Sequence, residues 1–129
     1  MLKRCTQLVI AWALLAAIPV SATTLEEVQR AWAQANYTLS GDQQLAALAS
    51  LSEEIDAALA EDQSNAELLI WDGIVKSTRA GKAGGLGALK LVKAARKSRE
   101  RAIKLDPAAL QGSAYTSLGA LYYQVPGWP

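Results

Sequence analysis

The charged side chains that this sequence offers for chemistry are carboxylates, amines and guanidinium groups. The 129-residue chain has no histidine and a single cysteine, Cys5. Without histidine, no Ser-His-Asp or Cys-His arrangement can activate a nucleophile. A disulfide needs a second cysteine, and zinc sites of the Cys/His kind need several such ligands. The carboxylates fall in helical patterns on solvated faces. We therefore expect no catalytic, cofactor-binding or metal-binding residues, and no enzyme.

The most regular set of charged residues is a row of basic side chains between residues 90 and 104. Lys90, Lys93 and Lys97 recur at three- and four-residue spacing, and Arg101 and Lys104 continue the row. This spacing puts them on one face of a helix. The start of such a helix offers free N–H groups and the positive end of its dipole to an anion. The pattern predicts either a solvated helix face or an anion-binding site at Lys90, Lys93 and Lys97.

The N-terminal residues have the order of a secretory signal peptide. Lys3 and Arg4 precede an apolar run over residues 8–18, and a cleavage motif follows at residues 20–22. This run is too short to span a bilayer. We expect residues 1–22 to be removed after Ala22 and the protein to be periplasmic or secreted. The mature chain, residues 23–129, is expected to have no stable membrane span.

Charge is divided sharply between the two halves of the chain. Residues 23–72 contain ten acidic residues and one base, Arg30, whereas residues 73–107 contain ten bases and two acids. Two interpretations stay open. Either the halves attract each other when they pack, or the basic face meets an acidic partner or anionic ligand. A basic block also suits nucleic acid, but an exported protein seldom meets any, so we expect no nucleic-acid partner.

The rest of the chain has the composition of α-helix, since Ala, Leu, Glu, Gln and Lys dominate and no segment alternates apolar and polar residues. We expect helices near residues 24–39, 42–60, 66–79, 86–105 and 112–124. Thr24 and Glu27 predict a capping box for the first helix, and Ser64-Asn65 predicts a cap for the third. The expected core face of the first helix is Leu25, Val28, Trp32, Ala35 and Leu39. That of the second helix is Leu45, Leu48, Leu51, Ile55 and Leu59. That of the fourth helix is Leu91, Ala94, Ala95, Ser98, Ala102 and Leu105.

The last predicted helix carries a motif with a characteristic spacing. An aromatic-x-x-Leu-Gly-x-x-Tyr pattern is formed by Tyr115, Leu118, Gly119 and Tyr122. Small residues and a helix-ending proline precede it at Ala95, Ala102 and Pro107. Together these residues resemble a tetratricopeptide repeat, and Gly73 resembles the glycine of the preceding repeat. The resemblance implies an all-α fold of antiparallel helical hairpins, stacked as a divergent TPR-like right-handed solenoid over residues 23–129.

Two residues and one segment depart from that repeat pattern. Arg99 stands where the family has a bulky aromatic residue, and Asp72 stands where it has leucine. Between Gly73 and Pro107 the chain is about ten residues longer than a 34-residue repeat allows. The surplus falls in AGKAGGLGA, residues 80–88, for which we expect a long glycine-rich loop. This segment, the export signal and the YYQVPGWP sequence resemble the periplasmic T-component group of tripartite ATP-independent periplasmic (TRAP) transporters.

The resemblance implies binding rather than catalysis. In repeats of this type the first helices line a groove that receives a partner. Here they supply Glu67, Ile70, Ile74, Ser77 and Thr78, and then Ser113, Thr116, Ala120, Tyr123 and Gln124. We expect an exported helical-repeat adaptor that mediates protein–protein interaction and serves solute uptake, with a periplasmic solute-binding protein as its partner. The alternative is a transport-linked component that binds a small organic anion near Lys90 and Lys93.

Residues 112–129 contain no charged residue, although the terminal units of repeat arrays carry a polar outer face. Tyr115, Leu118 and Tyr122 form an apolar face that a following helix would cover. We therefore expect the chain to be the N-terminal part of a longer array, incomplete at its C-terminus. Self-association through the uncapped last helix is also expected. The alternative is that Trp128 folds back over this face.

Overall fold

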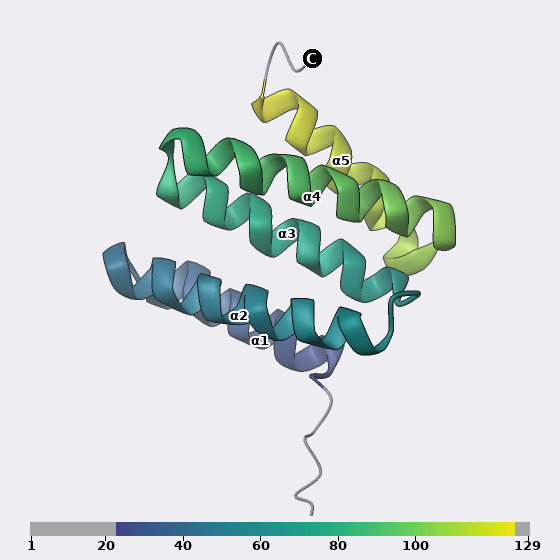
Figure 1. The fold of residues 1–129 in the computed structure, drawn as a ribbon, viewed down its shortest axis with the longest axis horizontal. Coiled ribbons are helices and arrows are strands. Elements are labelled where there is room, and N and C mark those ends of the chain that lie inside the picture. Colours follow the sequence, from purple (N-terminus) through teal and green to yellow (C-terminus); the bar gives the residue numbers. More distant parts are fainter. Residues whose placement is uncertain (1–22, 126–129) are drawn as a thin grey trace, which may run out of the picture.

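The computed structural model describes residues 23–125, and this part of the chain is all-α, as the composition predicts. Its helices are α1 (Leu25–Thr38), α2 (Gly41–Glu61), α3 (Ala66–Ala83), α4 (Gly85–Leu105) and α5 (Ser113–Gln124), with a short 3-10 helix, η1 (Ala109–Gly112), before α5. Consecutive helices pack against each other, mostly antiparallel (Figure 1). The predictions for residues 1–22 and for Trp128 lie outside the described residues.

Side chains fix the starts of α1 and α3. The Thr24 hydroxyl accepts from the Glu27 N–H at 3.2 Å, and the Thr24 N–H donates to the Glu27 carboxylate at 2.8 Å. This is the predicted capping box, and its hydrogen bonds lower the pKa of Glu27. At α3, the Asn65 side chain accepts from the Leu68 N–H at 3.0 Å. Both caps join residues three apart in the sequence, so local sequence is enough to identify them.

The glycine-rich segment is not the long loop that we expected. α3 continues to Ala83 and α4 begins at Gly85, so Gly84 alone separates them. Gly84 and Gly85 have φ angles of 64° and 68°, in the left-handed region that glycine adopts without a steric penalty. The chain therefore reverses within two residues. The other residues of this segment extend α3 and α4 instead, and the two helices run side by side (Figure 1).

The hydrophobic core lies between neighbouring helices. One cluster joins α1, α2 and α3 through Val28, Leu51, Ile55, Leu68 and Val75. A second joins α3, α4, η1 and α5 through small and branched residues, namely Ala66, Leu69, Ile70, Ala102, Ala109 and Ala114. The predicted core faces of the first two helices are confirmed at their centres, where Val28, Ala35, Leu48, Leu51 and Ile55 are buried.

The predicted core face of α4 is wrong at one end. Leu105 is 45% exposed, whereas Val92 and Arg99 are buried. The face that packs inward has Val92, Ala95, Arg99 and Ala102 at three- and four-residue spacing. The sequence prediction followed the apolar residues Leu91 and Leu105. It could not count an arginine among core residues, because arginine is almost never fully buried without a partner.

Candidate functional site

A pocket of about 390 Å³ opens between α3, α4 and α5. α3 contributes Ile74, Ser77 and Thr78 to its wall, and α5 contributes Ala120 and Gln124. All five belong to the set that the repeat resemblance assigns to the partner-binding groove. The structure therefore brings together residues from two predicted first helices, which are separated in the sequence by the whole of α4.

Arg99 of α4 lines this pocket and is only 3% exposed. Its Nε–H donates to the Ser117 hydroxyl of α5 at 2.9 Å, and its Nη1 donates to the Ser77 hydroxyl of α3 at 2.9 Å. The guanidinium group thus links three helices. Burial lowers the pKa of Arg99 to about 10, while the charge of Asp72 acts in the opposite direction. Arg99 therefore remains positively charged at neutral pH.

A glycine on the facing helix makes room for Arg99. A Cβ atom at residue 73 would lie 2.9 Å from Cγ of Arg99 and 3.1 Å from the carbonyl oxygen of Ala95. Because Gly73 has no side chain, the aliphatic part of Arg99 can lie against the α3 backbone. Gly119 of α5 differs, since a Cβ atom there would meet nothing within 4 Å. Only Gly73 is therefore required by helix packing in the described structure.

Asp72 is the second charged residue of the interior and is 1% exposed. One carboxylate oxygen accepts from Nζ of Lys76, and the other accepts from the Ser98 hydroxyl. Lys76 also pairs with Asp56 of α2 at 2.8 Å. Burial alone would lower the pKa of Lys76, but the hydrogen bonds with Asp56 and Asp72 outweigh it and raise this pKa. Asp72 and Arg99, the two departures from the repeat pattern, are thus the two charged residues buried within residues 23–125.

Thr78 connects the pocket to α1. Its hydroxyl accepts from Nε1 of Trp32 at 3.0 Å and donates to the Ile74 carbonyl at 2.9 Å. Trp32 in turn packs edge-to-face against Trp71. The Thr78 hydroxyl is therefore already engaged, whereas Ser77 and Gln124 can still donate to a ligand.

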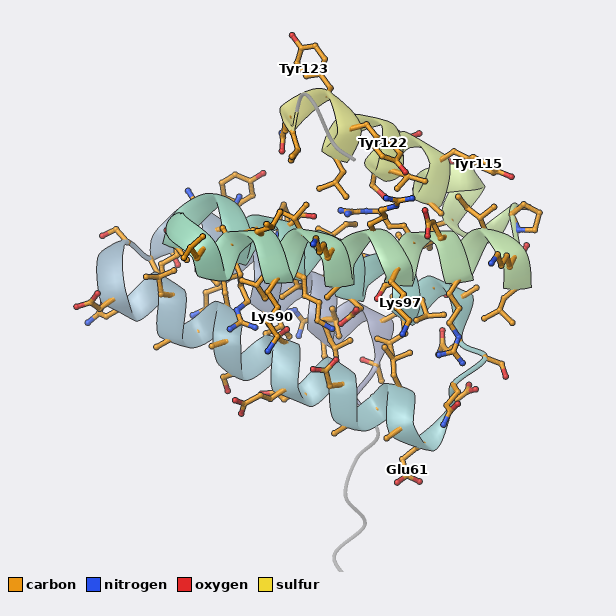
Figure 2. All side chains as sticks on the ribbon, turned by 45° about the horizontal axis from the view of Figure 1, so that its top comes forward. Glu61, Lys90, Lys97, Tyr115, Tyr122 and Tyr123 are labelled. Atoms are coloured by element: carbon orange, nitrogen blue, oxygen red, sulfur yellow. The ribbon has the colours of Figure 1, made fainter. Side chains whose placement is uncertain are left out.

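The other predicted groove residues lie outside the pocket. Ile70 is fully buried in the core, and the partly buried Ser113 donates to the Leu110 carbonyl at 2.6 Å. Glu67, Thr116 and Tyr123 are exposed on the surface. In Figure 2, Tyr115, Tyr122 and Tyr123 project from α5, and Tyr123 is 88% exposed.

The predicted anion-binding lysines also lie apart from the pocket. Lys90, Lys93 and Lys97 are exposed, and none of them lines it. Lys90 and Lys97 point away from α5 in Figure 2. Among residues 23–125, these three lysines, Arg101 and Lys104 form no ion pair. The pair of Lys76 with Asp56 does join the acidic and basic parts of the chain, through α2 and α3.

Sequence reasoning did not assign Arg99, Ser117 or Lys82 to the site, although all three line the pocket. The signal for Arg99 was present, because a charged residue occupies a position at which the repeat pattern has an aromatic core residue. A buried charge of this kind needs polar neighbours. The serines at residues 77 and 117 supply them, and they are brought to Arg99 only by the packing of α3 and α5.

Comparison of the chain with protein-family models, with curated proteins and with solved structures finds no match. The repeat resemblance consequently rests on the motif residues of the sequence alone. Within the described part of the chain, no cluster of three or more acidic side chains is arranged to hold a metal ion. Among the helices of residues 23–125, none combines the length and the hydropathy that a membrane span requires.

Proposed function

We propose that this protein is an exported helical-repeat adaptor that receives a segment of a partner protein in the groove between α3 and α5. The observation that carries the proposal is the common pocket of Ile74, Ser77 and Thr78 with Ala120 and Gln124. The repeat resemblance assigns these residues to the partner-binding side before any contact between them is known. The pocket wall has both apolar and polar residues, so it can contact apolar and polar side chains of a partner segment.

The finer fold assignment is part of the same proposal. We take α3, α4 and α5 as one and a half repeats of a divergent TPR-like right-handed solenoid. The close approach of Gly73 to Ala95 supports this assignment, because small residues at these two positions let the helices of a repeat approach each other. Arg99 and Asp72 replace the aromatic and leucine residues of the pattern, so the interior of this repeat is held by polar contacts as well as by apolar ones.

The proposed location is the periplasm or the exterior of the cell, and the proposed partner is a solute-binding protein of a TRAP-type uptake system. The order of residues in the signal segment supports export. N-terminal sequencing of the protein recovered from its native host tests this location, with Thr23 as the expected first residue. An intact Met1 on protein from the cytoplasm would contradict it.

Site-specific photo-crosslinking tests the adaptor function. A photoreactive amino acid is placed at Lys82 or Gln124, which are exposed residues of the pocket wall, and the protein is incubated with a periplasmic extract of the native host. Matched controls carry the same group at Glu54 of α2 and at Lys93 of α4, which are exposed outside the pocket. We expect one protein to crosslink from both pocket positions and from neither control. Equal crosslinking from the controls, or none from the pocket, would contradict the proposal.

The second candidate function is the binding of a small organic anion in a transport-linked component. The buried cation Arg99 favours this function. We place the anion at Arg99 instead of at Lys90 and Lys93, because Arg99 lines a pocket and the two lysines lie on an open helix face. Isothermal titration with small carboxylates distinguishes this function from the adaptor function. Binding of a free acid without any crosslinked protein partner would favour the second candidate.

A further inference from the structure

We infer that the pocket between α3, α4 and α5 is a receptor for a carboxylate group and that Arg99 is the residue that binds it. This inference rests on the proposed binding function of the groove and adds the chemical group that the groove recognises. Three properties of the site lead to it: the donors that Arg99 retains, the charge around it and the composition of the pocket wall.

Arg99 retains hydrogen-bond donors for a ligand. A guanidinium group has five N–H bonds, and within residues 23–125 Arg99 donates to only two acceptors, the hydroxyls of Ser77 and Ser117. The remaining donors belong to a side chain that is 3% exposed and lines the pocket. A buried cation without a hydrogen-bonded counter-ion is unfavourable, so an anion that enters the pocket gains from its presence.

The nearest acidic residue does not neutralise Arg99 by direct contact. Both carboxylate oxygens of Asp72 are taken by Lys76 and Ser98, and no ion pair of Arg99 occurs in the described part of the chain. Asp72 acts on Arg99 only through its charge. Together, Asp72, Lys76 and Asp56 sum to one negative charge, so Arg99 and the exposed Lys82 give the site a small positive excess. This excess suits a singly charged anion better than a dianion.

The wall of the pocket favours a carboxylate over an inorganic anion. Two parallel N–H bonds of a guanidinium group match the two oxygens of a planar carboxylate. Ser77 accepts from Arg99 and can donate its own hydroxyl proton, and Gln124, which lines the same pocket, can donate from its amide. Ile74, Ala120 and Leu121 are apolar, so they can contact the carbon atoms that a carboxylate ligand carries and that sulfate lacks.

Two sources can supply this group, namely an acidic side chain of a partner segment and a free organic acid. Titration of the ¹⁵N-labelled protein distinguishes them through the Nε–Hε resonance of Arg99, which is assigned by its loss in Arg99→Lys. The probes are acetate, propionate, the peptide Ac-Ala-Glu-Ala-NH2 and its matched control Ac-Ala-Gln-Ala-NH2. Sulfate at equal ionic strength controls for nonspecific binding of anions.

We expect saturable shifts with the carboxylate probes and none with the glutamine peptide or with sulfate. Tighter binding of the glutamate peptide than of propionate assigns the carboxylate to a protein segment, and the reverse order assigns it to a free acid. Either order supports the inference. The absence of a saturable shift with every carboxylate, or an equal shift with sulfate, would overturn it.

Substitutions of pocket residues test whether the shift of the Arg99 Nε–Hε resonance reports binding in this pocket. Arg99→Met should weaken carboxylate binding by about tenfold or more, since it removes the charged donors. If this variant does not fold, the exposed Lys82→Gln should still weaken binding by about threefold, while Lys93→Gln, outside the pocket, should leave it unchanged. Equal effects of Lys82→Gln and Lys93→Gln would overturn the inference. Crosslinking from Gln124 without any carboxylate response would leave the adaptor proposal standing and refute this inference alone.

Discussion

Lys76 contacts one buried and one exposed carboxylate, and replacing each in turn compares an interior charge with a surface charge. Asp72 is 1% exposed, whereas the side chain of Asp56 is 58% exposed. Asp72→Asn leaves Lys76, whose side chain is 14% exposed, with a single carboxylate. It also removes the negative charge that raises the pKa of Arg99.

The expected magnitudes differ severalfold. Removing one partner of a buried ion pair costs about 3–5 kcal/mol when it leaves the other charge alone. Since Lys76 keeps Asp56, we expect the lower end, about 3 kcal/mol, for Asp72→Asn. Asp56→Asn removes a contact at the surface and should cost about 1 kcal/mol or less. For a domain of this size, the melting temperature falls by about 4–8 °C per kcal/mol, which gives about 12–24 °C for Asp72→Asn.

Urea and thermal unfolding, followed by circular dichroism, measure both variants against the unmodified protein. If Asp72→Asn is too unstable to purify, Ser98→Ala removes one hydrogen bond to the same carboxylate and should cost about 1.5 kcal/mol. Comparable losses for Asp72→Asn and Asp56→Asn would show that the buried network does not stabilise the interior. A loss below about 1 kcal/mol for Asp72→Asn would refute the reasoning in the same way.

Three further predictions concern glycines and pH. Gly73→Ala should destabilise the fold by about 1–3 kcal/mol, because its Cβ would lie 2.9 Å from Cγ of Arg99. Gly119→Ala should instead stabilise the fold by about 0.5–1 kcal/mol, because its Cβ would meet no neighbouring atom within 4 Å. Urea unfolding measures both variants, and equal effects would contradict the packing described. The pKa of Lys76 is raised in the folded state, so its contribution to the free energy of unfolding is present below pH 10.5 and is lost above it. The stability advantage of the unmodified protein over Lys76→Met should therefore shrink above that pH. An advantage independent of pH would contradict the prediction. The folded-state pKa of Arg99 is lowered to about 10, so the protein should gain stability relative to Arg99→Met as pH rises above 10. This pH dependence is opposite in sign to that of Lys76. A stability difference that falls above pH 10 would contradict the prediction.

Local patterns in the sequence predicted much of the helical fold. The Thr24 and Glu27 cap depends on residues three apart, and the buried face of α2 follows from Leu48, Leu51 and Ile55. The prediction of a long glycine-rich loop was wrong because composition indicates where a chain can turn but not how few residues the turn needs. Gly84 and Gly85 suffice, and the neighbouring residues extend α3 and α4.

The sequence predicted the contributions of α3 and α5 to the candidate site but not that of α4. The repeat resemblance assigned Ile74 on α3 and Gln124 on α5 to one groove, and both line the pocket. Arg99 was missed because helical periodicity treats a charged residue as part of a solvated face. Its burial depends on Gly73 and on Ser117, which lie 26 and 18 residues away in the sequence and meet it only when three helices pack.

The central claim is that the groove between α3 and α5 receives the partner, and blocking this groove tests it most directly. Ala120→Trp places a large side chain at the pocket wall, and Ala57→Trp places the same side chain on the exposed face of α2 as a matched control. The measurement is the amount of the crosslinked partner that each variant captures from the periplasmic extract. We predict a loss of about tenfold or more for Ala120→Trp, because the added ring occupies the site, and no loss for Ala57→Trp. Equal capture by both variants would contradict the claim.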